Sequence, residues 1–162
     1  MQGRHVYQPK LFSFVTIESL IPQNHLLRKI DQILSFGFVR EMTASYYSSN
    51  HGRPSIDPEL FFRMMVVGYL YGISSDRQLC EELTYNLAYR WFCQLSLEDK
   101  VPEHSSLTRI RDRLGEEVFS QFFNKVVRIC QEKGLVKGES LMTDSTLIKA
   151  NASLDSLTPT DP

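Results

Sequence analysis

The sequence predicts a mainly α-helical protein. Apolar residues recur at three- and four-residue spacing in several stretches between residues 23 and 137, as they do on the buried face of a helix. Capping residues, glycines and prolines divide these stretches into segments of helix length. A strand-like composition is confined to residues 140–150. With 42% hydrophobic and 23% charged residues among 162, the composition is that of a folded globular chain.

The limits of this periodicity divide the chain into three parts. We expect an irregular N-terminal arm over residues 1–22, because prolines interrupt this stretch, and one helical domain over residues 23–137. Residues 138–162 begin with a stretch suited to one or two short strands and end in a polar, proline-containing tail. Because two strands cannot bury a face of their own, we expect them either to dock on the helices or to belong to a larger, truncated sheet.

The first predicted helix follows the arm. Asn24 is its expected N-cap, and the leucines and isoleucines of residues 26–34 recur at helical spacing. Gly37 interrupts this helix, and a second short helix can follow over residues 39–42.

The strongest helix signal begins at Asp57. This residue is an expected N-cap, Pro58 suits the first helical position, and Glu59 places a negative charge near the positive end of the helix dipole. The residues that follow are apolar nearly all round. We therefore expect a buried central helix that ends at Gly72.

Two shorter helices are predicted next. Ser74 or Ser75 is expected to cap the first, and a break at residues 84–86 separates it from a second over residues 87–95. Short helices with tight breaks between them are compatible with a helix-turn-helix scaffold.

The helical domain closes with two more predicted helices. Ser105 or Ser106 is expected to cap the first, and Gly115 separates it from a long amphipathic helix. Lys133 in the last turn and Gly134 after it are typical of a helix C-terminus.

The first of these two helices is the candidate nucleic-acid contact. Arg109 and Arg113 share one face, and Arg111 lies roughly 200° around the helix from Arg109. An arginine can bind guanine or phosphate through two parallel hydrogen bonds. The hydroxyls of Ser105 and Thr108 can bind the nucleic-acid backbone.

Arg53 and Arg77 are secondary candidates for the same contact. Arg53 lies in the turn-rich loop before the central helix, and Arg77 lies at the start of a shorter helix. The alternative interpretation is a solvated arginine face whose members pair with the nearby carboxylates Asp112, Glu116 and Glu117. The chain holds 18 Lys and Arg against 19 Asp and Glu, a net charge of -1, so any contact must come from a local basic face.

Asp144 is the candidate catalytic and metal-ligating carboxylate. It follows a presumed strand, where a rigid element could present it to Mg²⁺. Two-ion phosphoryl-transfer sites need several carboxylates, so one aspartate cannot hold two ions. The alternative is a turn-forming aspartate.

Several other classes of site are not supported. Cys80, Cys93 and Cys130 are widely spaced and odd in number, which predicts buried reduced thiols rather than a zinc site or a disulfide framework. The four histidines are scattered, and no phosphate-binding glycine loop or serine nucleophile elbow is present. No signal peptide or membrane-length apolar run is visible, so we expect a cytoplasmic protein with no membrane partner and no small-molecule substrate.

An ordered set of segments resembles the N-terminal part of bacterial insertion-sequence transposases of the IS5 and IS1182 type. These segments are residues 51–58 (HGRPSIDP), 69–79 (YLYGISSDRQL), 86–92 (NLAYRWF), 102–111 (PEHSSLTRIR) and 143–152 (TDSTLIKANA). They span nearly the whole chain in the family's order. The resemblance implies a helical domain that binds double-stranded DNA at the element's terminal inverted repeats, in the bacterial cytoplasm in association with the nucleoid.

The resemblance also implies an RNase-H-like catalytic domain with an Asp-Asp-Glu triad on Mg²⁺. Asp144 matches the first carboxylate of that triad, and the second Asp and the Glu have no counterpart in this sequence. We therefore expect the chain to be the DNA-binding part of a transposase, with a homodimer as a possible assembly. By itself, this chain is not expected to bind Mg²⁺. Two alternatives are an active Mg²⁺-dependent transposase whose missing carboxylates come from a second chain or a frameshift, and a helical interaction module or decayed remnant without a DNA role.

Overall fold

The computed structural model describes residues 15–48 and 55–135, and every regular element within these ranges is helical. In chain order the elements are α1 (Ile17–Leu20), α2 (Leu26–Ile33), α3 (Phe38–Thr43), the 3₁₀ turn η1 (Ala44–Tyr46), α4 (Pro58–Leu70), α5 (Asp76–Tyr85), α6 (Leu87–Phe92) and α7 (His104–Glu132). The mainly helical prediction is confirmed for this part of the chain. The predicted strands over residues 140–150 lie outside it.

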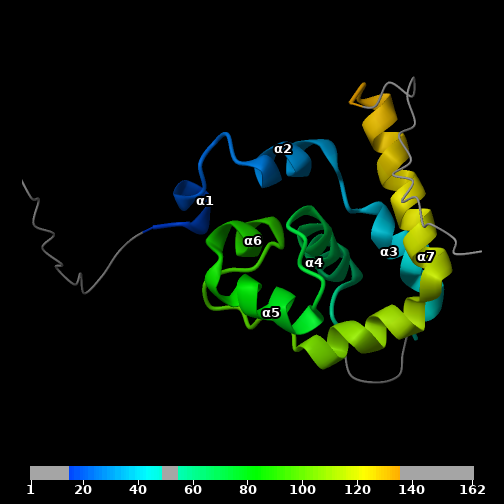
Figure 1. The fold of residues 1–162 in the computed structure, drawn as a ribbon. Coiled ribbons are helices and arrows are strands. Elements are labelled where there is room, and N and C mark those ends of the chain that lie inside the picture. Colours follow the sequence, from blue (N-terminus) through cyan, green and yellow to red (C-terminus); the bar gives the residue numbers. More distant parts are fainter. Residues whose placement is uncertain (1–14, 49–54, 136–162) are drawn as a thin grey trace, which may run out of the picture.

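Helix α4 is the buried centre of the fold, as its composition predicted. Figure 1 shows α4 with α2, α6, α5 and α7 around it. The Asp57 side chain accepts a hydrogen bond from the Glu59 backbone N–H at 2.9 Å, and Pro58 occupies the first turn. Gly72, with a φ of 68°, ends the turn that follows the helix, in a conformation that favours glycine.

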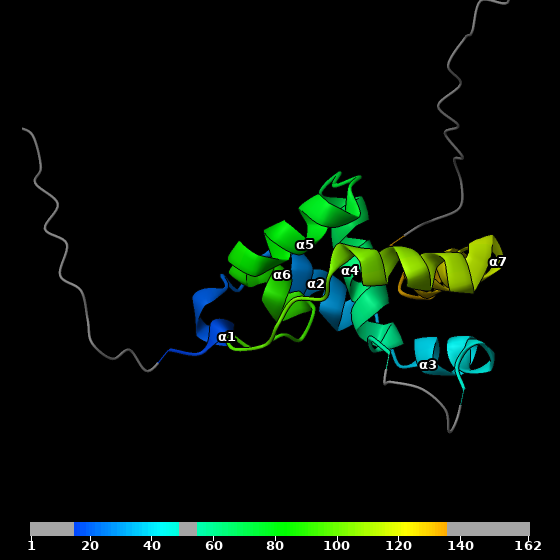
Figure 2. The same ribbon diagram turned by 90° about the horizontal axis from the view of Figure 1, so that it is seen from below.

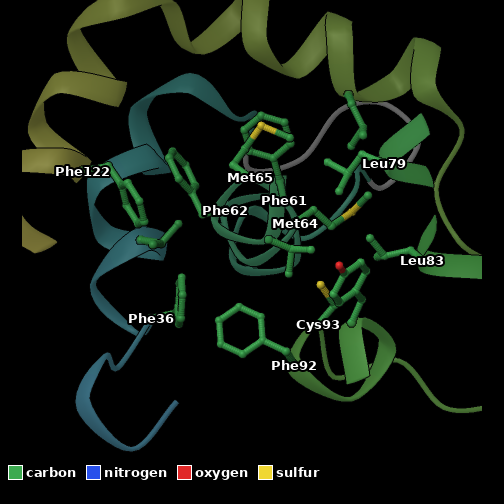
Figure 3. Packing of buried hydrophobic residues seen from close by; sticks show 14 of the residues in the cluster. Phe36, Phe61, Phe62, Met64, Met65, Leu79, Leu83, Phe92, Cys93 and Phe122 are labelled. Carbon is green, nitrogen blue, oxygen red and sulfur yellow. The ribbon is translucent and has the colours of Figure 1, made fainter. Parts of the chain in front are cut away.

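The core is built from aromatic and aliphatic side chains of α4 packed against α5, α6, α7 and the segment before α3. Figure 3 shows Phe61, Phe62 and Met64 of α4 between Phe122 of α7 on one side and Leu83 of α5 on the other. The rings of Phe62 and Phe122 lie 4.4 Å apart between centroids. Contacts of this kind unite helices α2 to α7 around one hydrophobic cluster.

The predicted break at Gly115 is confirmed as a kink within α7. Gly115 has φ 68° and ψ 174°, so the helix changes direction there although its ribbon is continuous. Figure 2 shows the distal half of α7 extending beside α3, away from the other helices. Residues other than glycine are strained at such a φ value.

Three capping predictions need correction or refinement. Asn24 does not cap α2: the helix begins at Leu26, and the Nδ1 of His25 accepts the Leu27 N–H at 3.2 Å. Neither Ser105 nor Ser106 caps α7, because the extended residue before the helix is Glu103. Of the two serines before α5, Ser75 is the cap.

The predicted irregular arm is wrong for residues 17–20, which form α1. Arg28 donates to the Glu18 carboxylate and to the Glu18 carbonyl at 2.6 Å, and its guanidinium lies over the Trp91 ring at 4.8 Å. The Trp91 indole N–H also donates to Glu18. These contacts hold α1 against α6 and lower the pKa of Glu18 through the hydrogen bonds from Arg28 and Trp91. They join residues far apart in sequence, so no local pattern predicts them.

Arg63 is a second buried tie between elements. It is 5% exposed and donates to Asp31 Oδ1 at 2.7 Å, to the Phe92 carbonyl at 2.8 Å and to Glu59 Oε1 at 3.2 Å. Its guanidinium also lies 4.4 Å from the centre of the Phe36 ring. A buried charge needs such partners, and these connect α4 to α2 and α6.

Within the described ranges, no helix has the length and hydropathy that crossing a lipid bilayer requires.

Candidate nucleic-acid interface

The proximal half of α7, residues 104–114, rests on α5 by one face. Leu107, Ile110 and Leu114 are buried, with exposed fractions of 3% or less. The spacing of these three residues directs the rest of the helix away from the core. This half of α7 therefore presents most of its polar side chains at the surface.

A buried arginine fixes the loop that leads into α7. Arg90 of α6 is 5% exposed and donates to the carbonyls of Ser96 and Asp99, the latter at 2.6 Å. The Ser96 N–H in turn donates to the Asp99 carboxylate at 2.7 Å, which lowers the pKa of Asp99. The start of α7 is thus positioned by side chains as well as by its own apolar face.

Asp76 joins α5 to α7. The Arg111 guanidinium donates from Nη2 to Asp76 Oδ1 at 2.7 Å and from Nη1 to Oδ2 at 3.1 Å. Thr108 Oγ1 donates to the same Oδ2 at 3.3 Å. The Asp76 side chain is 13% exposed and that of Arg111 44%. Two of the predicted DNA-binding residues are therefore held by a carboxylate of the neighbouring helix.

A mostly apolar hollow of about 440 Å³ opens beside this ion pair. Met65, Gly68 and Leu79 contribute to its walls, and Asp76 and Arg111 line the same hollow. Arg111 also donates to the Met65 sulfur at 3.3 Å. A group that approached Arg111 from this side would meet apolar surface and a guanidinium that already has a partner.

Among the described residues, the guanidinium groups of Arg109 and Arg77 have no partner. Both side chains belong to exposed residues, and neither makes a hydrogen bond or ion pair with any residue in the described ranges. Arg77 follows Asp76 in the first turn of α5. These two arginines can accept an anionic partner without giving up a contact with any described residue.

Arg113 lies on the side of α7 that faces η1. Its guanidinium is 5.4 Å from the centre of the Tyr47 ring, a cation–π contact, and Arg113 itself is exposed. Partial burial raises the pKa of Tyr47, an effect that the nearby Arg113 charge opposes. The guanidinium edge remains available to a further partner because the contact uses its face.

The predicted residues are therefore distributed over both flanks of α7. Arg109 and Arg113 share a side, Arg111 and Thr108 lie toward α5, and Ser105 is half-buried. The alternative pairing with Asp112, Glu116 and Glu117 is wrong for the described residues, because the carboxylate that binds an arginine of this set is Asp76. Arg53 and Asp144 lie outside the described residues. Sequence patterns missed the contacts that Asp76 and Tyr47 make with α7, because these are tertiary contacts.

The cysteines are free thiols, as predicted, and the predicted burial holds fully for Cys93 alone. Cys80, Cys93 and Cys130 are free; Cys93 is buried and the other two are half-buried. Burial raises the pKa of Cys93 to about 12 and that of Cys80 to about 11, so both thiols stay protonated at neutral pH. In the part of the chain that the structure describes, no three His, Cys, Asp or Glu side chains gather in a way that could hold a metal ion.

Comparison with known proteins identifies the family of this fold. Residues 15–113 match the family described as Transposase domain (DUF772). The match runs from just before α1 to Arg113, and so includes the described helices up to the arginines of α7. No solved structure matches the chain.

Proposed function

Because the chain belongs to the transposase domain family DUF772, we propose that it is the DNA-binding part of an insertion-sequence transposase. In this proposal it recognises the terminal inverted repeats of the element in double-stranded DNA. The observation that carries the proposal is the exposed proximal half of α7, whose arginines include one with no partner among the described residues and one held by an aromatic ring.

The arginines take different roles in this proposal. Arg109 and Arg77 bind phosphates, since a free guanidinium gives up no contact to do so. Arg113 contributes from its position over Tyr47. Arg111 acts mainly through Asp76, because a phosphate would have to displace a carboxylate that already makes two hydrogen bonds to it.

Three further predicted contacts complete the proposed interface. Thr108 and Ser105 supply hydroxyl groups near the start of α7, and Thr108 already donates to Asp76. Arg53 lies in residues 49–54; Tyr47, two residues before that segment, and Ser55, directly after it, line a hollow near α3. An Arg53 contact rests on the sequence alone.

A shift assay with an inverted-repeat duplex tests the proposal. Arg109→Ala/Arg113→Ala should weaken binding and flatten the dependence of log affinity on log salt by about 0.9 for each lost phosphate contact. Arg128→Ala is the matched control: Arg128 is an exposed arginine on the distal half of α7, paired with Glu132 at 3.1 Å. Unchanged affinity and slope in the double variant, or an equal loss in the control, would remove these arginines from the interface.

For Asp144 we propose the role of first carboxylate in a Mg²⁺-dependent nuclease site, on the strength of the sequence resemblance. One aspartate cannot hold two Mg²⁺ ions, and the described residues supply no further cluster of ligands. We expect the purified chain to leave DNA uncut when Mg²⁺ is added. Cleavage that Asp144→Asn abolishes would instead favour the alternative of a complete catalytic site.

A further inference from the structure

The distal half of α7 carries apolar side chains that the core does not use. We call Phe123, Val127 and Cys130 the outer stripe. Phe123 is 66% exposed, and Val127 and Cys130 are half-buried. Among the described residues, none of the three belongs to or packs against the hydrophobic core, whereas their neighbours Phe122 and Val126 do.

The outer stripe lies along one side of the helix. Its residues are spaced by four and three, so they project in nearly the same direction. Helix α3 covers a different side: the Phe38 ring lies 5.8 Å from that of Phe122 and 6.0 Å from the Lys125 ammonium. By helix geometry those contacts are about 100° or more around the axis from Phe123. Within residues 15–48 and 55–135, α3 therefore leaves the stripe uncovered, on a segment that extends away from the other helices (Figure 2).

We propose that the outer stripe is a self-association surface, which binds the same stripe of a second copy in an antiparallel pair. A twofold interface must be complementary to itself. Phe123 and Val127 lie equally far to either side of Lys125, and so do Ser120 and Cys130. An antiparallel pair centred at the level of Lys125 thus places each Phe123 ring against Val127 of the partner subunit, and each small Ser120 against a small Cys130.

The charges at the two ends of the segment favour the same register. Glu116 lies on the line of the stripe, two turns before Phe123, and Lys133 lies at the end of the helix. The register that centres on Lys125 sets Glu116 within one residue of the level of Lys133 of the partner subunit. A parallel pair would instead align Glu116 with its own copy. Antiparallel helix dipoles also attract rather than repel.

This surface is separate from the proposed DNA contacts. Phe123 lies beyond the Gly115 kink, whereas Arg109 and Arg113 lie before it. A variant of the outer stripe can therefore lose self-association while it keeps DNA binding, and a variant of the arginines can do the reverse.

Sedimentation equilibrium of the full chain tests the proposal. We expect a concentration-dependent dimer, and we expect Phe123→Asp to raise its dissociation constant more than about tenfold, because a charge replaces a buried ring at the centre of the interface. Leu97→Asp is the control: Leu97 is 58% exposed, in the loop between α6 and α7. The dimer should survive this change. Urea unfolding of each variant verifies that its fold is intact.

A charge exchange tests the antiparallel register. Glu116→Lys should weaken the dimer, and Glu116→Lys/Lys133→Glu should restore it, whereas a parallel pair would show no such rescue. A wild-type chain that stays monomeric at all concentrations would overturn the proposal, as would a dimer that Phe123→Asp leaves unchanged. If the protein is monomeric and Phe123→Asp lowers its unfolding free energy, the stripe makes a contact within one chain instead. The Phe123→Asp monomer should still shift a duplex with a single repeat.

Discussion

The carboxylate of Asp76 binds the guanidinium of Arg111 through both oxygens, at 2.7 and 3.1 Å. This pair joins the first turn of α5 to the proximal half of α7. It also divides the arginines of α7 into one that is committed to the protein and others that face outward. The consequences for stability and for DNA binding can be measured separately.

Breaking the Asp76–Arg111 pair should lower the free energy of unfolding, and it should change the affinity for DNA less. We expect Arg111→Ala and Asp76→Ala each to lower the unfolding free energy by about 1 kcal/mol, since Arg111 is partly screened by solvent. The double variant should lose less than the sum of the two single changes. Urea unfolding measures this coupling. If the losses of unfolding free energy in the two single variants simply add up in the double variant, the pair contributes nothing. If DNA binding by Arg111→Ala depends less steeply on salt, Arg111 is itself a phosphate contact.

Removal of Arg63 should be the most damaging single change among the surface and buried arginines. Arg63→Ala leaves the carboxylates of Asp31 and Glu59 without their partner and removes a cation from between two rings, at a cost of about 3 kcal/mol or more. Arg128→Ala should change stability by less than about 0.5 kcal/mol, because exposed pairs contribute little. Similar melting temperatures for the two variants would contradict this account.

The kink in α7 should depend on glycine. Gly115→Ala should lower stability by about 1–2 kcal/mol, because φ is 68° at this position and a Cβ atom is strained there. Gly37→Ala is the matched control: its φ is −55°, and a Cβ atom would meet only the Ser35 side chain, at 3.9 Å. We expect the control to be neutral or slightly stabilising. A Gly115→Ala variant as stable as Gly37→Ala would argue that α7 runs straight.

Acid should release α1 through Glu18. The pKa of Glu18 is lowered by hydrogen bonds from Arg28 and Trp91, so its contribution to stability is present above the ordinary glutamate pKa and is lost as the pH falls through the lowered value. In Glu18→Gln, the unfolding free energy should therefore change less with pH below the ordinary glutamate pKa than it does in the unaltered protein. Trp91 fluorescence reports on the same contact. An identical pH profile in both proteins would exclude Glu18 from it.

Much of the helix layout follows from local signals. Asp57, Pro58 and Gly72 bound α4, and Gly115 and Gly134 bound the two halves of α7, because capping and left-handed turns involve residues a few positions apart. The arginines of α7 were also predictable as a set. Their division into roles was not.

That division depends on residues distant in sequence. Arg111 meets Asp76 from α5 and Arg113 meets Tyr47 from the end of η1, whereas Arg109, alone among the arginines of α7, has no partner among the described residues. The same holds for α1, whose Glu18 depends on Arg28 and Trp91. The sequence by itself determined the bounds of α4, the break within α7 and which helix faces are apolar, since these properties are local. Only the tertiary structure decided which charges are paired and which stay free, because a charge finds its partner across helices.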